Sequence, residues 1–328
     1  MSDRQRVLLL GATGTIGRAT AAALLAKGHE VVCLIRPSPK DPRRGLPEGL
    51  ILRYGSATDA ASLARDGFAG EGFDAVVSCL ASRSGSPKDA WAVDHQAHLE
   101  ALRLAKMAGV RQFVLLSAIC VQRPLLAFQH AKVAFEAALI ASGMDYSIVR
   151  ATAYFKSLSG QVGRLRQGKP FLIFGDGTLT ACKPISDGDL GRYLAQCLDD
   201  PALRNRILPI GGPGPAITPR QQGEELFRLL GLEPKFRSVP VGFLSGIIGI
   251  LGILGRIAPK LRDKAELAKI GRYYATESML VLNQDGHYDA GATPETGTET
   301  LFDFYARLVR GEVSVDLGEH AVFQTASA

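Results

Sequence analysis

The feature that most constrains this chain is a glycine-rich turn between an apolar run and an alanine-rich stretch. Residues 6–28 read RVLLLGATGTIGRATAAALLAKG, and Gly11, Gly14 and Gly17 follow the first apolar run directly. Glycine at such positions lets backbone amides at the positive end of a helix approach a pyrophosphate closely. The segment therefore predicts a dinucleotide-binding turn, and a tight strand-to-helix turn without a ligand is the simpler alternative.

The end of the second apolar run indicates which dinucleotide binds. This run ends in CLIRPSP, so Arg36 stands where an acidic residue would take the ribose hydroxyls of NAD. Because an arginine at this place accepts a 2′-phosphate, we expect NADPH as the cofactor. An arginine that only ends a strand in solvent is the alternative. The other residues of the turn are assigned to cofactor binding with the glycines: Thr13, Thr15 and Ile16.

Apolar runs alternate with helical stretches over the first part of the chain. The runs EVVCLIR, DAVVSCLA and QFVLLSA are separated by stretches such as AHLEALRLAKMAG. This alternation is typical of βαβ units and of a parallel sheet that helices cover on both faces. We predict an α/β fold, with a doubly wound parallel sheet of the Rossmann type in residues 1–150. Residues 151–328 are predicted to form a smaller C-terminal α/β annex that binds the substrate.

Two patterns in the annex predict local structure. The segment FLIFGDGTLTACKPIS predicts a hairpin around residues 175–177, because Gly-Asp-Gly is a turn signal between apolar runs. Thr218, followed by Pro219 and Gln221, predicts a helix start with a capping box.

Composition and charge exclude several classes of function. Apolar residues make up 46% of the 328 residues and charged residues 21%, which is typical of a globular chain. Lys and Arg exceed Asp and Glu by 38 to 32, but they are scattered, which excludes a nucleic-acid footprint. The five cysteines form no CxxC pair, and MSDRQR is not a signal segment, so we expect a cytoplasmic protein. His95 and His98 lack a third ligand at suitable spacing, so we expect a solvated helix face there and no metal.

The run 241–259 has a different character from the rest of the annex. It reads VGFLSGIIGILGILGRIAP and is apolar for about 15 residues before Arg256. A membrane span needs about 20 residues, so the run is too short to cross a bilayer. Three interpretations stay open: a buried helix, a wall against a flat pigment, or a peripheral contact with a membrane surface.

The GxxGxxG spacing resembles that of the extended and atypical, NmrA-like short-chain dehydrogenase/reductases. That family carries a Tyr-x-x-x-Lys pair, in which the tyrosine is the acid and the lysine holds the nicotinamide ribose. The matching segment here reads AFQHAK, with Lys132 in place and Phe128 where the tyrosine would stand. Reduction of a carbonyl leaves an alkoxide that needs an acid, whereas hydride addition to a conjugated alkene leaves a delocalised carbanion. The missing tyrosine therefore favours a carbon–carbon double bond as the substrate.

Later segments closely resemble a narrower family. The segments CKPISDGDLGRYLAQCLDD, LPIGGPGPAITPRQQGEELFRLLGLEPKF and KIGRYYATESMLVL, together with FQHAK, are similar to the 8-vinyl reductases of divinyl chlorophyllide. The resemblance implies an NADPH-dependent oxidoreductase of chlorophyll and bacteriochlorophyll synthesis. Its substrate would be a chlorophyllide- or protochlorophyllide-type magnesium tetrapyrrole, whose C8 vinyl group becomes ethyl.

The resemblance also implies where the nicotinamide lies, and it is combined with the location expected from the composition and from the run 241–259. Lys132, Ser117 and Tyr154 are the candidates for proton delivery near the nicotinamide. The expected location is cytoplasmic, at the periphery of the photosynthetic membrane. A catalytically silent NADPH-binding scaffold or assembly factor is the alternative function, since the usual tyrosine is absent.

Overall fold

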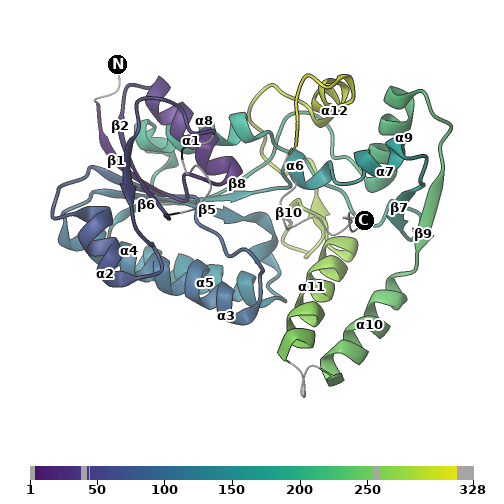
Figure 1. The fold of residues 1–328 in the computed structure, drawn as a ribbon, viewed down its shortest axis with the longest axis horizontal. Coiled ribbons are helices and arrows are strands. Elements are labelled where there is room, and N and C mark those ends of the chain that lie inside the picture. The colour runs from purple at the N-terminus through teal and green to yellow at the C-terminus, as the bar shows by residue number, and fades with distance from the viewer. Residues whose placement is uncertain (1–3, 38–42, 44, 255–258, 316–328) are drawn as a thin grey trace. The chain divides into compact units, whose positions relative to one another are not determined.

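The computed structural model describes residues 4–37, 43, 45–254 and 259–315, and the chain forms two compact units (Figure 1). Unit 1 consists of three chain segments: Met1–Arg83, Pro87–Ala151 and Asp187–Pro209. Unit 2 consists of the other three: Ser84–Ser86, Thr152–Ser186 and Ile210–Ala328. The predicted boundary at residue 150 assigns residues 187–209 to the annex, whereas in the structure they belong to unit 1.

Unit 1 is built on a sheet with the strand order β3-β2-β1-β4-β5-β6-β8 in the described residues. The strands are β1 (Arg6–Leu10), β2 (Glu30–Ile35), β3 (Ile51–Tyr54), β4 (Ala75–Ser78), β5 (Gln112–Ala118), β6 (Asp145–Ala151) and β8 (Arg206–Ile210). The first six strands pair in parallel. The order reverses between β1 and β4, the place where ligands bind in open α/β sheets. The predicted doubly wound parallel sheet is confirmed.

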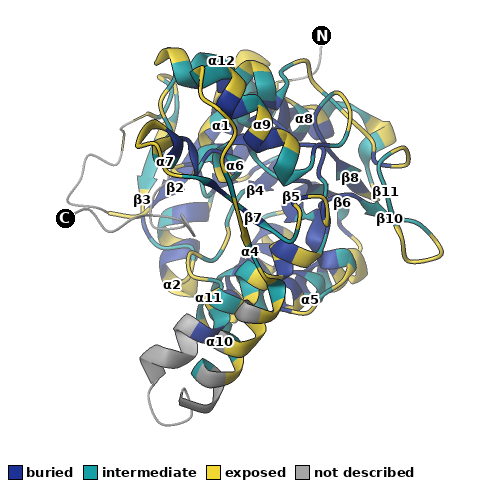
Figure 2. Cartoon of the chain, turned by 90° about the vertical axis from the view of Figure 1, so that its right-hand side faces the viewer, coloured by how far each residue is buried: buried dark blue, intermediate teal, exposed yellow. Residues whose placement is uncertain are grey.

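Helices cover both faces of this sheet, with α1 and α8 on one face and α2 to α5 on the other (Figure 1). The helical segments of unit 1 are α1 (Thr15–Ala26), α2 (Ala60–Ser62), η1 (Leu63–Phe68), α3 (Pro87–Ala90), η2 (Trp91–Ala97), α4 (His98–Met107), η3 (Ile119–Gln122), α5 (Ala127–Ala141), α8 (Asp187–Asp199) and η4 (Pro201–Leu203). Because both faces are covered, β1, β4 and β5 are almost wholly buried, as their near-continuous apolar runs predict (Figure 2).

Residues 187–209 belong to unit 1 because α8 packs closely on α1. A Cβ on Gly191 of α8 would lie 2.6 Å from the carbonyl carbon of Ala19 on α1. Only glycine allows the two helices to approach this closely, and β8 then adds a strand next to β6.

In its described residues, unit 2 contains two small sheets and its own apolar core. Its elements are α6 (Phe155–Leu158), α7 (Val162–Arg166), β7 (Phe171–Phe174), α9 (Pro219–Leu230), β9 (Phe236–Val239), α10 (Val241–Leu254), α11 (Pro259–Thr276), β10 (Val281–Leu282), β11 (Tyr288–Asp289) and α12 (Leu301–Arg310). The hairpin predicted around 175–177 is wrong, because β7 pairs in parallel with β9. The predicted capping box is confirmed: Thr218 Oγ1 accepts from the Gln221 N–H at 3.3 Å, and Gln221 Oε1 accepts from the Thr218 N–H at 2.9 Å.

The apolar run 241–259 forms α10, which lies beside α11 in unit 2 (Figure 2). Residues 255–258 of this run lie outside the described residues. On α10, Ser245 and Gly249 are exposed, and Ile248 is half-buried. In the part of the chain that the structure describes, no helix combines the length and the apolar character that crossing a membrane requires.

Candidate active site

The glycine turn joins β1 to α1 at the carboxyl edge of the sheet. Gly11 has φ +80°, in the left-handed region, and a Cβ there would lie 2.7 Å from the carbonyl oxygen of Cys79. A Cβ on Gly17 would lie 2.0 Å from the carbonyl oxygen of Gly11. The close contacts therefore exclude a side chain at both glycines, and the turn packs directly on the backbone that follows β4.

The start of α1 is suited to an anion. Gly14 is the N-cap residue, with an extended backbone at φ −71° and ψ 165°. Because glycine has no side chain, no side-chain oxygen caps the helix. The first turn of α1 carries no acidic residue. Thr13 and Gly14 are exposed, while Ile16 and Gly17 are buried beneath them. Since the positive end of a helix dipole stabilises a phosphate group, the residues present here fit a dinucleotide pyrophosphate.

Two arginines lie at the same edge, near the loop that follows β2. Arg36 is exposed and comes directly after β2. Arg18 is on α1, and a Cβ on Gly45 would lie 3.0 Å from its Nη1, so this guanidinium lies at the β2 loop. Sequence reasoning missed Arg18. The signal that could have found it is its place directly after the last glycine of the turn.

Lys132 lies on α5 and forms a buried ion pair. Its Nζ is 3.0 Å from Oδ1 of Asp94, which is on η2. The Lys132 side chain is 10% exposed and that of Asp94 is fully buried. The backbone N–H of Ser82 also donates to Asp94 Oδ1, at 3.3 Å. The other oxygen of Asp94, Oδ2, is buried and has no hydrogen-bond partner among the described residues.

The arrangement of three strands brings this ion pair to the edge that carries the glycine turn. Strands β1, β4 and β5 are adjacent and parallel, so the loops that follow them share one edge of the sheet. Gly11 contacts the backbone just after β4, and Ser82, in the same loop, binds Asp94. The turn and the Lys132–Asp94 pair are therefore joined by the β4 loop within unit 1.

His98 is buried beside this pair, so the expected solvated face is wrong for this residue. Its Nδ1 lies 2.9 Å from the carbonyl oxygen of Val93, which can only accept, so Nδ1 carries the proton. Its Nε2 then accepts from the Ser78 hydroxyl at 2.8 Å. Burial, together with the positive charge of Lys132, lowers the pKa of His98 to about 4, so the ring is neutral near pH 7. The described residues contain no group of three metal-ligating side chains.

Ser117 lies at the end of β5 in a second buried network. Its hydroxyl donates to Glu136 Oε1 at 2.5 Å, and Glu136 also pairs with the Arg150 guanidinium. Glu136 is on α5, four residues after Lys132, so the two residues lie on neighbouring turns of one helix face. The Ser117 proton is thus engaged within the protein.

Tyr154 is half-buried in unit 2, at the N-cap of α6, where it pairs with Ile185 in an isolated bridge. The structure therefore has the glycine turn, Arg36, Ser117 and Lys132 in unit 1 and Tyr154 in unit 2. The roles assigned to these residues stay predictions.

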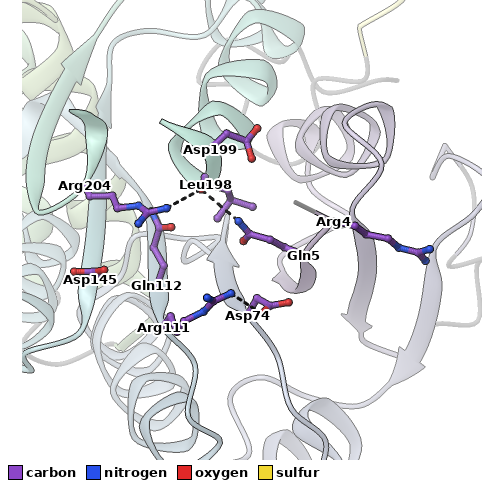
Figure 3. A pocket seen from close by; sticks show the side chains of 9 residues that line it. All are labelled: Arg4, Gln5, Asp74, Arg111, Gln112, Asp145, Leu198, Asp199 and Arg204. Atoms are coloured by element: carbon purple, nitrogen blue, oxygen red, sulfur yellow. Dashed lines mark hydrogen bonds and ion pairs between the residues drawn. The ribbon is translucent and has the colours of Figure 1, made fainter. Parts of the chain in front are cut away.

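A polar cavity of about 310 Å³ lies at the opposite, amino edge of the sheet (Figure 3). Its lining residues are Arg4, Gln5, Asp74, Arg111, Gln112, Asp145, Leu198, Asp199 and Arg204. Arg111 Nη2 is 2.7 Å from Asp74 Oδ1, so these two charged residues of the lining form an ion pair. None of the predicted site residues lines this cavity, and it is separate from the candidate active site.

Comparison with known proteins identifies the family. Residues 11–201 match the NAD(P)H-binding family. Divinyl chlorophyllide a 8-vinyl-reductase, chloroplastic, from Oryza sativa subsp. indica is 47% identical, with 97% of this chain and 82% of the relative covered. The protein of the same name from Zea mays is 46% identical over the same shares of the two chains. The chain belongs to the divinyl chlorophyllide a 8-vinyl-reductase family.

The family match decides two of the predictions made from the sequence. The predicted family is confirmed, and the NAD(P)H-binding match confirms the expected nicotinamide cofactor. Among solved structures, leucoanthocyanidin reductase with NADPH from Vitis vinifera has a TM-score of 0.67 and 16% identity. The alignment covers 93% of this chain and 99% of that one. At this identity the likeness supports the fold alone, and it agrees with the predicted Rossmann architecture.

Proposed function

We propose that this chain is an NADPH-dependent oxidoreductase that reduces the C8 vinyl group of a divinyl chlorophyllide-type magnesium tetrapyrrole to ethyl. The observation that carries the proposal is the junction of the glycine turn, through the β4 loop, with the buried Lys132–Asp94 pair. This arrangement occurs in a chain that is 47% identical, over nearly its whole length, to a protein named for that reaction.

In this proposal, different residues of unit 1 bind different parts of NADPH. The amides of the turn around Gly14 bind the pyrophosphate, and Arg36 binds the 2′-phosphate with support from Arg18 at the same loop. Lys132 holds the nicotinamide ribose, as the family resemblance implies. When bound, NADPH supplies the hydride that adds to the terminal vinyl carbon, and one proton then completes the ethyl group. The macrocycle spreads the intervening negative charge, so no alkoxide acid is needed at Phe128.

Among the three candidates for the proton, the geometry favours Lys132. Its ammonium carries three protons and lies 3.0 Å from Asp94 Oδ1, which leaves N–H groups for other partners. The Ser117 proton is already donated to Glu136, and its loss would leave a buried alkoxide beside a carboxylate. Tyr154 stays a candidate from unit 2, which we propose as the substrate unit.

We further propose that the α10 and α11 helices make the peripheral contact with the photosynthetic membrane in a cytoplasmic protein. Leu267 and Tyr274 on α11 are 51% and 46% exposed, and α10 carries only apolar and small residues. These features favour an interfacial contact over a buried helix. Ile248→Asp should weaken co-sedimentation with anionic liposomes without changing NADPH affinity, and equal binding of both proteins would contradict the contact.

The decisive experiment is turnover. Purified protein with NADPH and divinyl chlorophyllide should shift the Soret band to shorter wavelength, because one conjugated vinyl group is lost. NADPH oxidation should accompany the shift mole for mole. If the protein binds NADPH but consumes none with either divinyl chlorophyllide or divinyl protochlorophyllide, the reductase proposal fails and the silent scaffold is supported instead.

A further inference from the structure

We propose that Asp94 is a positioning residue for NADPH: Oδ1 holds the Lys132 ammonium in place, and Oδ2 accepts a hydrogen bond from a ribose hydroxyl of the bound cofactor. The inference deepens the proposed function and rests on it for the identity of the cofactor. Sequence reasoning did not identify Asp94, because WAVDHQA contains no pattern that separates it from a solvated helix residue.

The Asp94 carboxylate has hydrogen-bond partners on only one of its two oxygens in the described structure. Its side chain is fully buried, and Oδ1 has two partners, the Ser82 N–H and the Lys132 Nζ. Oδ2 has none among the described residues. A buried polar atom without a partner destabilises the free protein, and a charged group does so more than a neutral one. The chain therefore retains an unsatisfied acceptor that an O–H donor would satisfy.

This acceptor belongs to a residue that is tied to the cofactor turn. Asp94 is tied by Ser82 to the loop after β4, and the same loop supports Gly11 of the glycine turn. The neighbouring imidazole of His98 is engaged with Ser78 and Val93, so it does not supply the missing donor. No described side chain supplies a donor for Oδ2, and the residue that carries it is tied to the edge where the cofactor turn lies.

Charge also links Asp94 to Lys132. The Lys132–Asp94 pair has no net charge. Because both side chains are buried, removal of one partner would leave the charge of the other uncompensated. Without the carboxylate, the Lys132 side chain would lose the contact that fixes its ammonium. Asp94 thus acts on the cofactor both directly, through Oδ2, and through Lys132.

The test is a double-mutant cycle in NADPH affinity, measured by cofactor fluorescence without any pigment. Asp94→Asn should weaken NADPH binding about fivefold to tenfold, and Lys132→Met about tenfold. The double variant should bind more weakly than Lys132→Met alone but clearly less weakly than the product of the two single losses, because part of the Asp94 effect passes through Lys132 and part is direct. Multiplied losses, or an Asp94→Asn affinity equal to that of the wild type, would overturn the proposal.

Two further variants keep the test decisive. Asp74→Asn changes a carboxylate of the opposite edge in the same unit and should leave NADPH affinity unchanged. If Asp94→Asn alone does not fold, Asp94→Glu keeps the charge but displaces both oxygens, and it should weaken NADPH binding with little loss of stability. Wild-type affinity in Asp94→Glu would also contradict the proposal. The cycle does not use chlorophyllide, so the expected pattern without turnover would refute the proposed function alone.

Discussion

Helix α5 carries one buried carboxylate, Glu136, and pairs with a second, Asp94, through Lys132 on the neighbouring turn, and the two carboxylates have their hydrogen bonds satisfied to different degrees. Glu136 receives the Ser117 hydroxyl on Oε1 and the Arg150 guanidinium on Oε2. Asp94 receives Lys132 and a backbone N–H on one oxygen only, and its other oxygen has no partner in the described structure. Both groups are equally buried, so burial alone does not separate a structural ion pair from a functional one.

Glu136 and Asp94 differ in whether the protein itself supplies a hydrogen-bond partner for every carboxylate oxygen. A network whose acceptors are all filled rigidifies the core, since the low local dielectric strengthens each bond within it. A network with one acceptor left open is costly for the free protein and becomes complete when a ligand arrives. On this view Glu136 stabilises the fold, and Asp94 and Lys132 serve the cofactor.

The largest expected effect is on turnover. Lys132→Ala should lower kcat/KM about 100-fold, because displacement of the nicotinamide ribose by about 1 Å can cost this much. Pigment absorbance and NADPH oxidation would measure it. Phe128→Tyr is the matched control on the same helix and should not raise the rate, since no alkoxide forms. A Lys132→Ala rate within threefold of the wild type would show that the Lys132–Asp94 pair does not serve the cofactor.

The next effect is on stability. Arg150→Met leaves the buried Glu136 carboxylate without its cation and should lower the free energy of unfolding by about 2 kcal/mol. This figure is below the usual range for a buried pair because the Arg150 side chain is 18% exposed. Urea denaturation would measure the change. NADPH affinity of the folded variant should stay at the wild-type value, and a loss of binding would show that the two networks are not separable.

A smaller effect is expected at an exposed cation. Arg36→Ala should weaken NADPH binding about tenfold, or about 1.4 kcal/mol, because a charge-assisted hydrogen bond to the 2′-phosphate is lost. NADH, which lacks that phosphate, should bind almost as before. Fluorescence titration with both cofactors would compare them. Equal losses for NADPH and NADH would mean that Arg36 supports the loop rather than the phosphate.

Local patterns in the sequence were sufficient where a structure depends on neighbouring residues. The spacing of Gly11, Gly14 and Gly17 predicts the turn because two of these glycines, Gly11 and Gly17, are required by contacts within or just beside it. The capping box at Thr218 depends on one helical turn, and the structure has both of its hydrogen bonds. For the same reason the parallel sheet of unit 1 could be predicted from its apolar runs.

Contacts between distant segments could not be predicted in this way. The signal at 175–177 is the same whether β7 turns back on itself or pairs with β9, and the partner strand decides the outcome. The burial of His98 depends on Ser78 of β4, which no helical spacing reveals. Asp94 meets Lys132 only because η2 packs on α5, so the candidate site was predicted without one of its charges.

The close approach of Gly191 to α1 has a consequence for any attempt to dissect the protein. A fragment that ends near residue 150 would lack α8 and β8, so it would expose the face of α1 that Gly191 covers and leave β6 as an open strand edge. Such a fragment should aggregate rather than bind a nucleotide. A linker that replaces residues 152–186 and joins Ala151 to Asp187 would be needed to obtain the nucleotide-binding half by itself.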